Sequence, residues 1–153
     1  MTTDVKNILL AEDSEQDVEL TLEALRENNL ANAVVVVRDG AQALDYLYAR
    51  GEFTNRMNGL PAVVLLDLKM PKVDGMEVLR TIRGDAKLKE LPVVILTSSR
   101  EERDLVEAYG LGVNAYVVKP VDFGEFHTAV KTLGVFWALI NEPPRGIAKK
   151  RKP

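Results

Sequence analysis

The strongest constraint on the fold is an alternation, repeated five times, between short apolar segments and longer amphipathic segments. The apolar segments span residues 8–11, 34–37, 62–66, 93–96 and 115–118. Because they are apolar at every position, they predict strands buried on both faces, as in a parallel sheet covered by helices. The amphipathic segments predict helices over about residues 14–28, 40–48, 75–84, 101–110 and 122–140. Five such units predict an α/β fold with a doubly wound open sheet.

The composition fits one compact domain without disulfides or a membrane span. The chain has 153 residues, of which 46% are hydrophobic, and it contains no cysteine. No segment approaches the run of about 18 apolar residues that a membrane helix needs. Residues 1–7 lack the basic and apolar parts of a signal peptide. We therefore expect a cytoplasmic protein that does not enter a membrane.

The charge is distributed unevenly along the chain. Residues 143–153 contain five basic residues and no acidic one, which leaves 15 basic and 23 acidic residues, a charge of −8, in residues 1–142. An acidic body argues against direct DNA binding, because duplex affinity depends on phosphate contacts. We expect a folded domain over residues 1–142 and a disordered basic tail over residues 143–153, which could still touch an acidic partner or nucleic acid.

Polar residues stand directly after four of the predicted strands. Glu12 and Asp13 follow the first strand, Asp67 the third, Thr97 the fourth and Lys119 the fifth. Ligands of doubly wound sheets bind at the carboxyl ends of the strands, so these side chains are expected to meet. Any one of them alone would also fit a solvated loop. Together, partly buried carboxylates at one edge predict a hard divalent cation, and Mg²⁺ is the economical choice.

The sequence around these residues resembles a known family. The segments ILLAEDS, LLDLKMPKVDG, VVILTSS and AYVVKPV, with Thr97 and Lys119 following Asp67 by 30 and 52 residues, are similar to the receiver domain of bacterial response regulators over about residues 5–140. The resemblance implies a five-stranded parallel, flavodoxin-like (βα)5 sandwich with strand order 2-1-3-4-5. It also implies a phosphoacceptor signalling protein rather than an enzyme with a separate substrate.

The resemblance assigns roles to the residues at the strand ends. Asp67 would accept a phosphoryl group from a histidine kinase, and Lys119 would pair with a phosphoryl oxygen. Asp13, Asp67 and the main-chain oxygen of Lys69 would bind Mg²⁺, with Glu12 acting through water. Phosphoryl transfer needs in-line positioning and neutralised oxygens, which a metal and an ammonium group supply.

The same resemblance implies a switch. The Thr97 hydroxyl would donate to the phosphoryl group and draw the following loop inward, and the side chain of Tyr116 would follow. The Lys119–Pro120 bond is expected to be cis. The Lys69 side chain could affect access of the hydrolytic water or could simply be solvated, and the small Ser98 would leave room for the donor histidine.

The last predicted helix indicates how the signal leaves the domain. No second folded domain follows it, so a single-domain regulator is expected. Residues 135–140 are apolar at every position, whereas a surface helix of a monomer should show a polar face there. We predict a homodimer through the last helix and the chain end, with an interface formed by Phe136, Trp137, Leu139 and Ile140.

Two segments resemble one group within the family. The long polar segment 49–61 and the end VFWALINEPP look like the regulators that partner bacterial and cyanobacterial phytochromes, which are red-light-sensing histidine kinases. The alternatives are a regulator of another kinase and a phosphorelay intermediate.

Rival functions on the same architecture are less compatible with the sequence. A flavin binder needs backbone N–H groups around a phosphate after the first strand, where Glu12 and Asp13 would repel it. A dehalogenase-type phosphatase has a second aspartate two residues after the nucleophile, where this chain has Lys69. A degenerate receiver acting only as a scaffold is the third option, against which the complete set of site residues argues.

Overall fold

The computed structural model describes residues 7–26, 33–56, 59–70 and 72–132. Five parallel strands form one sheet of order β2-β1-β3-β4-β5, which confirms the predicted fold class and strand order. The strands are β1 (Ile8–Ala11), β2 (Val34–Val37), β3 (Val63–Asp67), β4 (Val93–Thr97) and β5 (Ala115–Val118).

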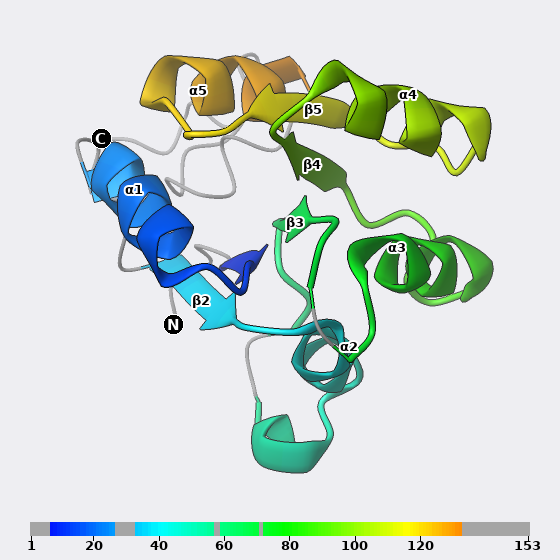
Figure 1. The fold of residues 1–153 in the computed structure, drawn as a ribbon. Coiled ribbons are helices and arrows are strands. Elements are labelled where there is room, and N and C mark those ends of the chain that lie inside the picture. The colour runs from blue at the N-terminus through cyan, green and yellow to red at the C-terminus, as the bar shows by residue number, and fades with distance from the viewer. Residues whose placement is uncertain (1–6, 27–32, 57–58, 71, 133–153) are drawn as a thin grey trace, which may run out of the picture.

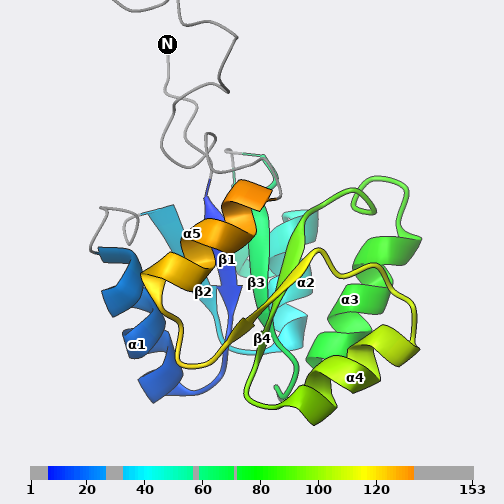
Figure 2. The ribbon, with the colours of Figure 1, turned by 90° about the horizontal axis from the view of Figure 1, so that it is seen from above.

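In the described ranges, five α-helices cover the sheet in two layers, as Figures 1 and 2 show. They are α1 (Glu15–Arg26), α2 (Gly40–Tyr48), α3 (Gly75–Gly84), α4 (Arg100–Ala108) and α5 (Phe123–Thr132). Helices α1 and α5 lie on one face, and α2, α3 and α4 lie on the other. None of the helices in the described ranges is long and apolar enough to cross a membrane.

The strands are apolar throughout because each face of the sheet has its own core. In β1, Leu9 and Ala11 belong to the cluster beneath α2, α3 and α4, whereas Ile8 and Leu10 belong to the cluster beneath α1 and α5. All four residues are fully buried. Alternate side chains of a strand point to opposite faces, so a sheet covered on both sides needs apolar residues at successive positions.

The element bounds differ from the predictions mainly at the strand ends that carry polar residues. Strands β3 and β4 extend one residue further than predicted, because Asp67 pairs with Leu96 in the ladder and Thr97 pairs with Val118. The sheet therefore fixes the backbone of both polar residues. Helix α4 begins one residue earlier than predicted and ends at Ala108. The ends of the first and last predicted helices, at residues 27–28 and 133–140, lie outside the described residues.

The segment before β3, predicted as a polar loop, contains a short 3-10 helix (Gly51–Phe53). Phe53 packs edge-on against Tyr46 of α2, with ring centroids 5.0 Å apart. The Arg56 guanidinium lies 4.8 Å from the centre of the same Tyr46 ring. These contacts attach the described part of the segment to α2, which its polar composition did not indicate.

Candidate functional site

The backbone around the candidate site is held by the sheet and by α3. The Glu12 N–H donates to the Val37 carbonyl at 3.0 Å, and the Lys119 N–H donates to the Thr97 carbonyl at 2.9 Å. After β3 the chain turns into α3 at Gly75, where a Cβ atom would lie 2.4 Å from the Asp67 carbonyl oxygen. Only glycine allows this approach, so Gly75 fixes the path of the chain that leaves Asp67.

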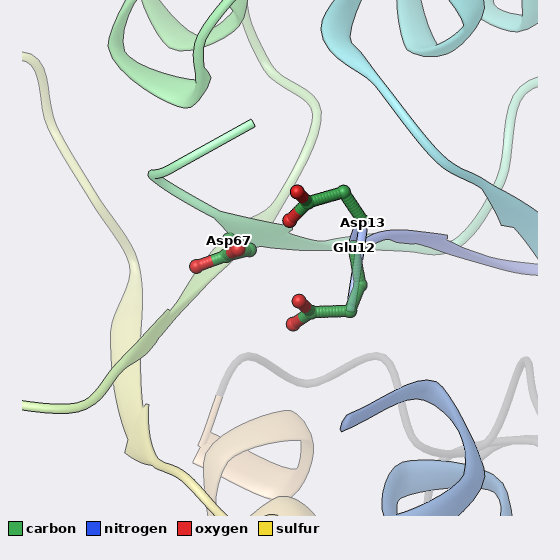
Figure 3. A group of neighbouring side chains, drawn as sticks. All are labelled: Glu12, Asp13 and Asp67. Atoms are coloured by element: carbon green, nitrogen blue, oxygen red, sulfur yellow. The ribbon is translucent and has the colours of Figure 1, made fainter. Parts of the chain in front are cut away.

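Three carboxylates converge at the ends of β1 and β3. Glu12 is fully buried, Asp67 is 4% exposed and Asp13 is exposed. Each offers an oxygen within 4.8 Å of the others. Figure 3 shows Glu12 and Asp13 leaving the chain on opposite sides, with both carboxylates directed toward the end of β3, where Asp67 lies. The structure thus brings together the three carboxylates predicted from the sequence.

Burial raises the pKa values of the two carboxylates Glu12 and Asp67. Burial raises the pKa of Glu12 to about 7, and the neighbouring Asp67 charge adds to the effect. Burial also raises the pKa of Asp67, although Lys119, a hydrogen bond with Glu12 and the Lys69 backbone N–H oppose this. Ionisation of Glu12 and Asp67 is therefore unfavourable unless further positive charge lies beside them.

Lys119 brings one positive charge into the cluster. Its Nζ lies 3.4 Å from Glu12 Oε1, 3.4 Å from Asp67 Oδ1 and 3.0 Å from Asp17 Oδ2. Burial lowers the pKa of Lys119, but Asp17, Asp67 and Glu12 outweigh that effect and hold it above its usual range. The ammonium group therefore stays charged. The Lys119–Pro120 peptide is cis, as predicted.

Asp17 is a member of the site that was missed in the sequence. It lies in the first turn of α1, where its N–H donates to the hydroxyl of Ser14, the residue that caps this helix, at 3.2 Å. The position of Asp17 in the sequence could have placed it at the site, since the first turn of a helix that follows a strand lies beside that strand's carboxyl end. An acid in that turn is common at helix N-termini for electrostatic reasons alone, so it did not stand out.

The predicted switch residues lie on the neighbouring strands. Thr97 is 3% exposed, and its hydroxyl lies 2.7 Å from the Ser99 carbonyl oxygen and 3.1 Å from Glu102 Oε1. Tyr116 is partly buried at the β5 edge, and the Arg103 guanidinium of α4 lies 4.8 Å from its ring centre. Thr97 and Tyr116 therefore both contact residues of α4.

The remaining predicted residues have varied surroundings. The Lys69 side chain is 80% exposed, and its Nζ pairs with Glu102 Oε2 at 3.3 Å. Ser98 is exposed beside the site. Glu102 was not predicted as a site residue, although it completes a Ser-x-x-Glu pattern with Ser99. The predicted interface residues Phe136, Trp137, Leu139 and Ile140 lie outside the described residues.

The donor set fits a hard divalent cation. All three clustered groups are carboxylates, and the chain has no cysteine that would favour a softer metal. Burial raises the pKa values of both Glu12 and Asp67, and a cation beside them would favour their charged forms. Three carboxylates this close together are suited to hold a cation of the size and charge of Mg²⁺ or Mn²⁺.

Comparison with known proteins agrees with the fold. Residues 8–131 match the model of the response regulator receiver domain. The bacteriophytochrome response regulator AtBRR is 62% identical, with a TM-score of 0.83 over 90% of this chain and 99% of its own. The response regulator Rcp1 of Synechocystis is 39% identical over 86% of this chain and 88% of its own length.

Two further comparisons bear on the metal and on the breadth of the family. The Mn²⁺-bound form of Rcp1 superimposes with a TM-score of 0.68 at 37% identity, covering 91% of this chain and 99% of that structure. A methanogenesis regulatory protein, FilR2 of Methanothrix harundinacea, is 39% identical over 90% of this chain and 86% of its own length. The predicted likeness to phytochrome response regulators is confirmed, and this chain belongs to the response regulator receiver family.

Proposed function

We propose that this receiver takes a phosphoryl group onto Asp67 from a phytochrome histidine kinase, in a reaction that requires Mg²⁺. The observation that carries the proposal is the buried Asp67 carboxylate, which lies 3.4 Å from the Lys119 ammonium and within a cluster of three carboxylates. The high identity to a bacteriophytochrome response regulator supports the choice of donor.

The transfer is a displacement at phosphorus. A carboxylate oxygen of Asp67 attacks the phosphorus of the phosphohistidine, and the P–N bond breaks as the imidazole leaves with the bonding electrons and takes up a proton. The product is an acyl phosphate on Asp67. Water can later attack the same phosphorus, which restores the carboxylate and releases inorganic phosphate, so the signal would end without a separate enzyme.

The residues around Asp67 each have a part in this proposal. Lys119 moves from its carboxylate partners to a phosphoryl oxygen, and the Thr97 hydroxyl donates to another. Asp13, Asp67 and the main-chain oxygen of Lys69 would hold Mg²⁺, with Glu12 acting through water. When bound, the ion neutralises the negative charge on the phosphoryl oxygens.

Phosphotransfer from a panel of purified histidine kinases tests the proposal. Each kinase is loaded with labelled phosphate and mixed with this protein, and label on the regulator is followed with time. We expect the fastest transfer from a red-light-sensing kinase, and loss of transfer when a chelator removes divalent cations. Faster transfer from a kinase of another class would contradict the phytochrome partner, and no transfer from any kinase would contradict phosphoryl acceptance.

The proposal extends to a homodimer through the last helix and the chain end. The sequence pattern at residues 135–140 supports this, since no polar position interrupts it. On the described part of α5, Phe126 and Val130 are fully buried against the sheet. An extension of that helix with apolar residues on every side would need a second surface to cover them, and an isologous contact between two copies supplies one.

Charged residues at Trp137 and Leu139 should convert the dimer to a monomer. We expect the double variant Trp137→Glu, Leu139→Glu to sediment as a monomer at concentrations where the parent sediments as a dimer, because burying two carboxylates in an apolar contact is strongly unfavourable. Leu20→Glu is the matched control, since Leu20 is an exposed apolar residue of α1, 41% accessible. A double variant that remains dimeric would refute the interface.

A further inference from the structure

Glu102 links three parts of the molecule beside the Asp67 site. It lies in the first turn of α4, and its side chain is only 12% exposed. Oε1 accepts from the Thr97 hydroxyl at 3.1 Å and from the Ser98 N–H at 3.2 Å, and Oε2 pairs with Lys69 Nζ at 3.3 Å. One carboxylate therefore joins α4, the end of β4 and the chain that follows β3.

The Glu102 carboxylate does not accept the hydrogen bond that its sequence pattern usually predicts. In a Ser-x-x-Glu capping box, the glutamate side chain accepts from the N–H of the capping serine. Here Ser99 does cap α4, since its hydroxyl accepts from the Glu102 N–H at 3.2 Å. The Ser99 N–H, however, donates to Thr97 Oγ1 at 3.2 Å, and the Glu102 carboxylate reaches back to Ser98 and Thr97 instead. Its contacts therefore serve Thr97 and the β4–α4 connection as well as the helix cap.

These contacts hold the proton of the Thr97 hydroxyl on acceptors other than Asp67. The hydroxyl has a single proton, and its two acceptors are the Ser99 carbonyl oxygen and Glu102 Oε1. Among the hydrogen bonds of the described residues, none joins Thr97 Oγ1 to Asp67. A phosphoryl group on Asp67 can receive this proton only after the hydroxyl has left both acceptors.

The charge state of Glu102 makes the contact a strong one. Burial would raise the pKa of Glu102, but hydrogen bonds from the Ser98 N–H, Lys69 and the Thr97 hydroxyl outweigh this and hold it below its usual range. Hydrogen bonds to a charged acceptor are stronger than those between neutral groups. The nearby cation, Lys69, lies two residues after Asp67 and could exchange Glu102 for a phosphoryl oxygen.

We propose that Glu102 is a positioning residue that restrains the Thr97 hydroxyl on the α4 side of β4, and that phosphorylation must break this contact to switch the domain. The proposal rests on phosphoryl acceptance at Asp67. Removing the contact lowers the free energy needed to reach the switched state, so a Glu102 variant binds a phosphoryl mimic more tightly than the parent does.

Beryllofluoride, which mimics a phosphoryl group on a carboxylate, provides the test. In the presence of Mg²⁺, we expect Glu102→Ala and Glu102→Gln to bind it at least about fivefold more tightly than the parent, measured by calorimetry. Glu101→Gln is the matched control, because Glu101 is an exposed acid in the same first turn of α4. It should leave the affinity unchanged.

A double-mutant cycle with Thr97→Val separates a role through Thr97 from other roles. In that background, substituting Glu102 should no longer change the affinity, because the restrained hydroxyl is absent. A gain that persists there would mean that Glu102 acts only through Lys69, which would overturn the proposal, as would an unchanged or weaker affinity in both Glu102 variants. Failure of the parent protein to bind beryllofluoride would instead contradict the proposed function itself.

Discussion

Replacing Asp67 by asparagine should abolish phosphorylation completely. Asparagine matches the shape of the aspartate, but its amide is not a nucleophile toward phosphorus, and no acyl phosphate can form. With Mg²⁺ and a small phosphodonor such as acetyl phosphate, the parent should gain one phosphoryl group by intact-protein mass spectrometry, and the Asp67→Asn variant should gain none. Asp104→Asn, at an exposed aspartate of α4, should be phosphorylated as the parent is.

The same substitution should stabilise the protein when no divalent cation is present. Burial raises the pKa of Asp67, so ionisation of this group at neutral pH opposes folding, and a neutral asparagine removes that cost. In chelator, we expect the Asp67→Asn variant to have a higher melting temperature than the parent. When Mg²⁺ is added, the melting temperature of the variant should rise less than that of the parent. Phosphoryl incorporation that persists in this variant would show that another residue is the acceptor.

The fold was largely predictable because its strands carry an unambiguous pattern. Apolar residues at successive positions occur where both faces of a sheet are covered, and the two cores on either side of β1 have this arrangement. The 3-10 helix Gly51–Phe53 was not predictable, because it depends on contacts of Phe53 and Arg56 with Tyr46 of α2 rather than on local periodicity.

The convergence of the site residues was predictable only in part. Residues that directly follow apolar strands, such as Asp67 and Lys119, can be placed at one edge of a parallel sheet from topology alone. Asp17 and Glu102 reach the same edge from the first turns of α1 and α4. In sequence, an acid in a first helical turn has an ordinary explanation in the helix dipole, and only side-chain geometry shows that these two contact Lys119 and Thr97.

Replacing Lys119 by methionine should have the second largest effect. The variant retains most of the side-chain volume but loses the charge that lies between Glu12, Asp17 and Asp67. Negative charge develops on the phosphoryl oxygens during transfer, and a preorganised group that stabilises such charge commonly contributes about 10²-fold or more to the rate. We expect the rate of phosphorylation by acetyl phosphate to fall by about that factor, with Mg²⁺ at saturation.

The location of Lys119 makes the expected loss specific to this lysine. Lys89→Met, at an exposed lysine after α3, removes the same charge from the molecule as a whole and should leave the rate unchanged.

The Lys119 variant should also bind Mg²⁺ more tightly in the unphosphorylated state, because the carboxylates that Lys119 partly neutralises then rely on the ion alone. Tighter Mg²⁺ binding together with slower phosphorylation would distinguish a lost contact with the phosphoryl group from a collapsed metal site. A variant that is phosphorylated at the parental rate would show that the ammonium group, 3.4 Å from Asp67, takes no part in the transfer.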